Sequence, residues 1–196
     1  MRSKLGFAVA AIVVMGMFVG CGKKTAQAPP SGGVRKVRGV IVPAWAPKNP
    51  SPEFLRAAKV LKPLPDDFRT STLPGPERQV ALRRYAMTTS AIYEFFGTLS
   101  DEQIQKFVTS GEIRIPVKEL TASQRKALNT CFERCDEANK DYPTIEESLV
   151  NLYKHGAAQD LSNVDVGFKM HNHLVDFFSL VKGPKGVWIS GTFAYM

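Results

Sequence analysis

The hydrophobic pattern of this chain changes its period once, near residue 164, and that change limits the possible folds. Before it, apolar residues recur at steps of three and four, as on one side of an α-helix. From Val164 to Met170 they alternate with polar residues, as in a strand with one buried face. Residues 173–181 and 187–193 are expected to be two more strands, joined by residues 183–186. Helices followed by neighbouring strands predict an α+β fold with a C-terminal antiparallel meander.

Local signals predict where the helices begin and end. Ser51-Pro52-Glu53 supplies a capping hydroxyl, a proline suited to the first helical turn and an acid at the positive end of the helix dipole. A long helix is expected over residues 76–96, stopped by Gly97. Three capping boxes, in which a hydroxyl residue is followed three positions later by Gln or Glu, predict further helices starting after Ser100, Thr121 and Thr144.

Two other segments are expected to be extended. Residues 34–42 are rich in Val and Ile with charges between them, which is typical of an edge strand, and this strand is a candidate to join the C-terminal meander. Residues 113–117 are expected to cross in extended form from one helix to the next. We interpret residues 34–196 as a single α+β domain, which is long enough to bury a core.

The first 20 residues have the pattern of a signal peptide. Arg2 and Lys4 give a positively charged start, an apolar run follows from Leu5, and the small residue Gly20 stands directly before Cys21. The apolar run is shorter than the ~20 residues that a membrane-spanning helix needs. A cleaved leader is therefore favoured over an uncleaved membrane helix.

The last four residues of this stretch, Phe18-Val19-Gly20-Cys21, resemble the lipobox of bacterial lipoproteins. The resemblance covers these residues and the leader, with Phe18 where the class usually has Leu. It implies that a diacylglyceryl group is attached to the Cys21 sulfur, that cleavage falls before Cys21, and that the new amino terminus is acylated, for example with palmitate. Two or three acyl chains hold a protein at a membrane far more firmly than one. The alternative is an ordinary secreted protein whose leader ends in Cys.

The residues after Cys21 are interpreted as a tether on the extracytoplasmic side of the membrane. Pro29-Pro30 stiffens residues 21–33 and Gly32-Gly33 loosens them. In an organism with two membranes, attachment to the outer membrane is expected, because Gly22 is not the Asp that resembles an inner-membrane retention signal.

The positive charge of the chain is concentrated around this tether. The formal net charge is +8 at pH 7, yet residues 1–52 hold eight bases and no acid, which leaves 18 of the 26 bases to balance all 18 acids in residues 53–196. A nucleic-acid-binding domain would need a basic face on its folded part, so this distribution does not favour nucleic acid as a partner. Attraction to an anionic membrane surface and a solvated linker are the two remaining interpretations.

Cys131 and Cys135 are four residues apart, so on a helix they share a face, which also carries Leu128 and Phe132. Free cysteines pack as small apolar side chains, which gives the first interpretation. The second is a disulfide, which persists outside the cytoplasm but would distort a regular helix. A redox or metal-binding pair is the third.

His171 and His173 share one face of a strand if the strand continues through them, with Asp176 and His155 as candidate neighbours. Metal sites use such pairs, although only two ligands are local here. Asn172 suits a turn equally well, and a polar strand end is then the alternative. We expect no bound cofactor.

Familiar catalytic motifs are absent from the sequence, which contains no G-x-S-x-G, no H-E-x-x-H and no phosphate-binding glycine loop. The sequence therefore favours a lipid-anchored, non-enzymatic protein of the cell envelope that contacts membrane lipid through Cys21 and binds a protein or cell-wall component through its domain. One alternative is a hydrolase-like envelope enzyme that uses His171, His173 and Asp176. Another is a thiol–disulfide protein that uses Cys131 and Cys135.

Overall fold

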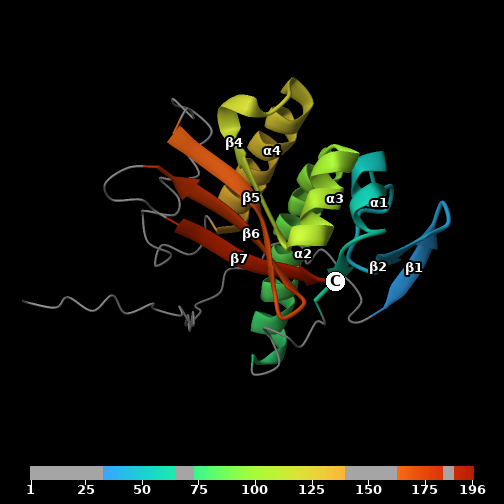
Figure 1. Cartoon of the computed structure of the whole chain (residues 1–196). Coiled ribbons are helices and arrows are strands. Elements are labelled where there is room, and N and C mark those ends of the chain that lie inside the picture. Colours follow the sequence, from blue (N-terminus) through green and yellow to red (C-terminus); the bar gives the residue numbers. More distant parts are fainter. Residues whose placement is uncertain (1–32, 65–72, 140–162, 183–187) are drawn as a thin grey trace, which may run out of the picture.

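The predicted C-terminal meander is present in the computed structural model (Figure 1). β5 (Val164–His171), β6 (Leu174–Val181) and β7 (Trp188–Tyr195) are consecutive antiparallel neighbours. Helices lie mainly before these strands, so the α+β prediction is confirmed. The structure describes four stretches of the chain, which are residues 33–64, 73–139, 163–182 and 188–196.

The sheet is wider than the meander, because a strand joins it at each edge. β4 (Glu112–Pro116) pairs with β5, and the two-residue β3 (Lys62–Pro63) pairs with β7, which gives the order β3-β7-β6-β5-β4. The sequence predicts β4 as extended but gives no sign that it belongs to the sheet. Its apolar residues Ile113 and Ile115 are both buried, which explains the pairing.

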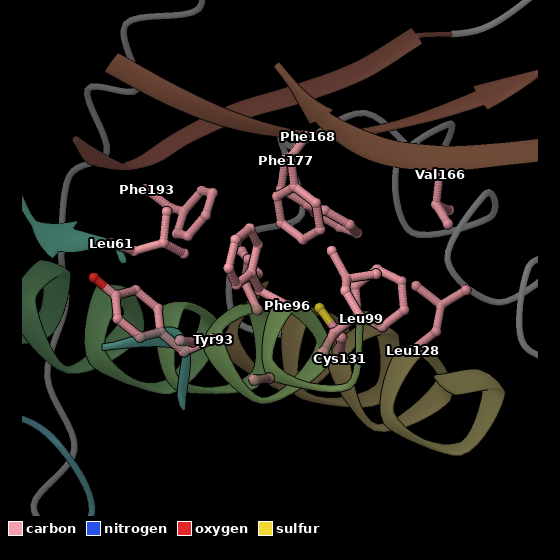
Figure 2. Close-up of a cluster of buried hydrophobic side chains, with 14 of the residues drawn as sticks. Leu61, Tyr93, Phe96, Leu99, Leu128, Cys131, Val166, Phe168, Phe177 and Phe193 are labelled. Carbon is pink, nitrogen blue, oxygen red and sulfur yellow. The ribbon is translucent and has the colours of Figure 1, made fainter. Parts of the chain in front are cut away.

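Four α-helices lie in the described parts of the chain. α2 (Gly75–Gly97) and α4 (Ala122–Asn139) pack against each other beneath one face of the sheet, and α1 (Pro52–Ala57) packs against α2 (Figures 1 and 2). α3 (Asp101–Ser110) leads into β4, and the short 3₁₀-helix η1 (Val117–Glu119) connects β4 to α4. None of the described helices is long and apolar enough to span a membrane.

The predicted helix caps are present wherever the structure describes them. The Ser51 hydroxyl accepts a hydrogen bond from the Phe54 amide at 3.1 Å. Ser100 and Gln103 form both hydrogen bonds of a capping box, and so do the two residues of the second box. Gly111 ends α3 with a φ of 73°, a left-handed conformation that glycine adopts without steric cost. The third box, after Thr144, lies outside the described residues.

The second capping box is connected to the first through Gln124. This buried side chain is paired with Thr121 in its own box, and its amide nitrogen donates to the side-chain oxygen of Gln103 at 3.0 Å and to the carbonyl oxygen of Thr98 at 3.2 Å. The starts of α3 and α4 are therefore held together by hydrogen bonds between their caps.

Aromatic side chains fill most of the space between sheet and helices (Figure 2). The fully buried ring of Phe168, from β5, is central. Its centroid lies 5.0–6.2 Å from those of five other phenylalanines, which are Phe95, Phe96, Phe107, Phe177 and Phe193. Such pairs add stability beyond the area that they bury.

A bulge in β7 connects the sheet to α2. Val175 pairs with Ala194 and Asp176 with Thr192, so Phe193 is an extra residue on β7. Its carbonyl oxygen accepts a hydrogen bond from the Tyr85 hydroxyl at 2.8 Å, and the same hydroxyl accepts from the Leu64 amide at 3.1 Å. Tyr85 thus joins α2 to β7 and to Leu64, the residue that follows β3.

The N-terminal segment does not form the single strand that its composition predicts. Instead β1 (Val34–Val37) and β2 (Val40–Pro43) form a separate two-stranded sheet. Arg38 and Gly39 turn the chain back with φ values of 49° and 84°, the positive pair that a tight hairpin turn requires. The proposal that this segment joins the C-terminal meander is therefore wrong. Figure 1 shows the hairpin at the edge of the molecule beside α1, away from β4, β5 and β6.

Candidate functional site

The face of the sheet opposite the helices carries a group of charged side chains. Side chains alternate along a strand, so β5 directs Phe168 toward the helices and Lys169 to the other side. The strand register then places Glu112 of β4 and Asp176 of β6 directly across from Lys169. Charges from three strands therefore meet at the same end of the sheet.

Close polar contacts connect these side chains. One carboxylate oxygen of Glu112 lies 3.5 Å from Arg114 and the other lies 3.8 Å from Lys169, and His171 Nδ1 lies 3.4 Å from Asp176 Oδ2. Asp176 is the most buried member, with a side-chain exposed fraction of 15%, and the other four are at least one-third exposed. We refer to these five residues as the charged row. Each exposed pair contributes little stability, so the main property of the row is its fixed order of charges.

A buried aromatic residue lies beside this row. The guanidinium carbon of Arg114 is 5.8 Å from the centre of the Phe178 ring, within the range of a cation–π contact. Phe178 lies across from Gly167, and a Cβ at Gly167 would be 2.7 Å from the ring and would overlap the Ile113 carbonyl oxygen. Glycine at 167 thus lets the ring lie over the strand, where it orients Arg114.

Only part of the predicted histidine site comes together. Asn172 and His173 form the turn between β5 and β6, with φ values of 48° and 66°. The interpretation that His171 and His173 share a strand face is therefore wrong, and the turn is the correct alternative. His173 is exposed, and its carbonyl oxygen accepts from the Met196 amide at 3.0 Å. His155 lies outside the described residues, among which no three His, Cys, Asp or Glu residues cluster as metal ligands do.

Cys131 and Cys135 lie on the face of α4 that packs into the core, and both are buried thiols that form no disulfide with each other. Figure 2 shows the Cys131 side chain directed into the apolar cluster. A hydrogen bond with the Cys135 thiol and burial together raise the pKa of the Cys131 thiol well above its ordinary value. A protonated thiol is a poor nucleophile. This arrangement fits the interpretation of the pair as packing thiols.

Glu94 is a residue of α2 that faces α4, close to these thiols. Its carboxylate is 3.4 Å from Arg134, and its side chain is 23% exposed. Burial raises the pKa of Glu94, and the attraction of Arg134 offsets this only in part. The sequence contains no local signal for this residue, because the pair is formed by two helices that pack side by side.

A groove that the sequence does not predict runs along the solvent-facing side of α4. It has a volume of about 680 Å³ and is lined by Leu120, Ala122, Arg125, Lys126, Asn129, Thr130 and Glu133. Except for Leu120, which precedes α4, these residues lie on the side of α4 opposite Leu128 and Cys131, which are buried. The lining carries charges of both signs, so it selects no particular class of ligand.

Comparison of the chain with protein-family models, with curated proteins and with solved structures finds no significant match. Cys21 and the leader lie outside the described residues. Of the features described above, the charged row is the candidate interaction site within the described domain.

Proposed function

We propose that this protein is a lipoprotein of the bacterial cell envelope, anchored through Cys21, whose domain binds another envelope component without catalysing a reaction. The observation that carries the proposal is the leader followed by Phe18-Val19-Gly20-Cys21. A positively charged start, a short apolar run and a small residue before Cys are together typical of lipoprotein processing. The extracytoplasmic location follows from that processing.

The charged row supports the binding part of this proposal. It places two cations, a histidine and two carboxylates in a fixed order on a sheet, and rigid placement lowers the entropy cost of ordering side chains when a partner binds. Arg114, held over Phe178, can form paired hydrogen bonds with a carboxylate. We therefore propose a partner that presents carboxylates, with the cations of the row as the main contacts.

Cell fractionation tests the anchor. We expect the wild-type protein to enter the membrane fraction and to release its leader, whereas Cys21→Ser keeps the leader because the processing site is lost. Lys23→Ala is the matched control, since it changes a neighbouring residue outside the lipobox. Identical processing of the Cys21→Ser and wild-type chains would contradict the proposal.

Capture from envelope extracts tests the binding face. We expect the double variant Arg114→Glu, Lys169→Glu to lose partners that the wild type retains. Lys106→Glu, on the exposed side of α3, changes one charge elsewhere and should leave capture intact. Equal capture by all three proteins would show that the charged row is not the binding face.

A further inference from the structure

We infer that one face of the β1–β2 hairpin rests on the anionic surface of the membrane that holds the protein. The hairpin face consists of Val34, Lys36, Arg38 and Ile41. This inference rests on the proposed lipid anchor, and it adds to it a second, non-covalent membrane contact that orients the domain.

The two sides of the hairpin differ in burial, except at its base, where Pro43 pairs with Val34 and is buried. On the inner side Val42 is fully buried, and Val37 and Val40 pack against the core. On the outer side Val34 is 69% exposed and Ile41 is 65% exposed. These are the two most exposed large apolar side chains in the described parts of the chain, and both lie on the same small sheet. In the absence of a partner, the apolar side chains of this face are exposed to water, so the face is suited to contact with an apolar medium such as the interior of a membrane.

The hairpin presents this face in a fixed direction. Arg35, on the inner side, donates hydrogen bonds to the carbonyl oxygens of Ala46 at 3.0 Å, Lys48 at 3.4 Å and Pro47. At the open end, the Ala44 amide donates to the Gly33 carbonyl oxygen at 2.8 Å. Arg35 therefore serves to hold the hairpin in place, which leaves the other bases for an external contact.

The charge around the face is complementary to an anionic lipid surface. Lys36 lies across from Ile41 in the strand register, Arg38 is in the turn, and all three are exposed, as is Lys48 in the following loop. Residues 33–52 contain no acid, and the first one is Glu53 at the start of α1. Exposed bases beside apolar side chains are typical of segments that lie in the membrane interface.

The position of the hairpin in the chain places it near the membrane. Twelve residues separate Cys21 from Val34, so the two residues lie at most about 45 Å apart even when the chain between them is fully extended. The hairpin is the first described element after the anchor. It is therefore the part of the described domain whose distance from the lipid is most tightly limited by the chain.

Depth-dependent fluorescence quenching tests this inference on the full-length protein, expressed in a host that processes lipoproteins and reconstituted into vesicles. Ile41→Trp places a probe on the hairpin face, and Val108→Trp is the matched control because Val108 is also exposed, at 39%, but lies on α3. The vesicles contain phosphatidylcholine with brominated acyl chains, with or without phosphatidylglycerol. The signal of the native Trp45 and Trp188 is subtracted by using the wild type.

We expect bromine to quench the probe at 41 several-fold more than the probe at 108, and the difference to grow with phosphatidylglycerol. Adding Lys36→Glu and Arg38→Glu to the Ile41→Trp protein should abolish that growth. Equal quenching at both positions would overturn the inference. An Ile41→Trp emission that shifts with protein concentration but not with bromine would also overturn it, because it would indicate that a second copy of the protein covers the hairpin face.

Mass spectrometry of the N-terminal peptide in the same samples separates this inference from the proposed anchor. An N-terminal peptide without lipid refutes the anchor. In that case, the unlipidated protein is mixed with preformed vesicles, and its quenching still decides whether the hairpin face binds the vesicles. A lipidated peptide with equal quenching at both positions keeps the anchor and refutes the hairpin contact.

Discussion

At the scale of single residues, Glu94 carries a charge that its surroundings accommodate poorly. Burial raises its pKa, so the folded protein holds this proton more tightly than the unfolded chain does. The ionised carboxylate therefore lowers stability above the folded pKa, and stability is regained as the pH falls through that value toward the unfolded one. We expect the stability of the wild type relative to Glu94→Gln to rise as the pH is lowered from 7 toward the ordinary glutamate pKa of about 4.3, in urea unfolding experiments.

The variant Arg134→Gln provides the control for this prediction. It removes the cation that lowers the pKa of Glu94, so the pH dependence should become steeper than in the wild type. A pH dependence that is the same in all three proteins would show that Glu94 is not the group responsible.

The thiols Cys131 and Cys135 should be unreactive in the folded protein. Cys131 is fully buried, its pKa is raised, and alkylation requires an accessible thiolate. We expect neither cysteine to be alkylated under native conditions and both to be alkylated in urea, as measured by mass spectrometry. Rapid native labelling would support the redox interpretation, and a chain lighter by two hydrogens that resists labelling in urea would reveal a disulfide.

Residue patterns in the sequence predict part of the candidate site. His171 and Asp176 do meet, because the register of a short hairpin brings nearby residues together. His173 does not, since two residues with positive φ are needed to close the turn. Two further members of the charged row, Glu112 and Arg114, come from β4, and no local signal indicates which strand lies beside β5.

At the scale of elements, the close packing of α1 on α2 depends on Gly97. A Cβ at this position would overlap the backbone of Glu53, and backbone cannot move aside as a flexible side chain can. We expect Gly97→Ala to lower the free energy of unfolding by about 2 kcal/mol or more. Gly75→Ala is the control, because no atom lies within 4 Å of an added Cβ there, and it should change stability by no more than about 1 kcal/mol. Equal effects of the two substitutions in chemical denaturation would contradict this account of the α1–α2 contact.

The two capping boxes should behave as one unit. Because Gln124 bonds to Gln103 as well as to its own cap, replacing both with Ala should cost less than the sum of the single changes. A double-mutant cycle is expected to give a coupling energy of about 1 kcal/mol. A coupling energy near zero would mean that the caps stabilise α3 and α4 independently.

At this scale, the sequence predicts the features that depend on residues close together in the chain and misses those that depend on distant residues. Caps at Ser51, Ser100 and Thr121 are formed within four residues, so the sequence predicts the helix starts correctly. The pairing of β4 with β5 joins residues that are far apart in the chain, and only the packed core determines it. The Arg38-Gly39 turn is local and has a recognisable glycine, but the alternation on either side of it resembles one continuous strand.

At the scale of the whole molecule, we propose that the leader and tether set the location of the protein and that the domain binds a partner. The bases of residues 1–52 are unopposed, whereas residues 53–196 carry equal numbers of acids and bases. Two different surfaces of the described domain then have two different proposed partners. The hairpin face, which directly follows the tether, would contact lipid, and the charged row of the sheet would remain available to a carboxylate-bearing component.

The most direct test of the central claim is the mass of the N-terminal peptide of the mature wild-type protein. We predict that it begins at Cys21 and carries a diacylglyceryl group on sulfur, with or without an acyl group on nitrogen. A mature chain that begins at Cys21 or elsewhere with no lipid, or a chain that retains Met1 to Gly20, would contradict this prediction.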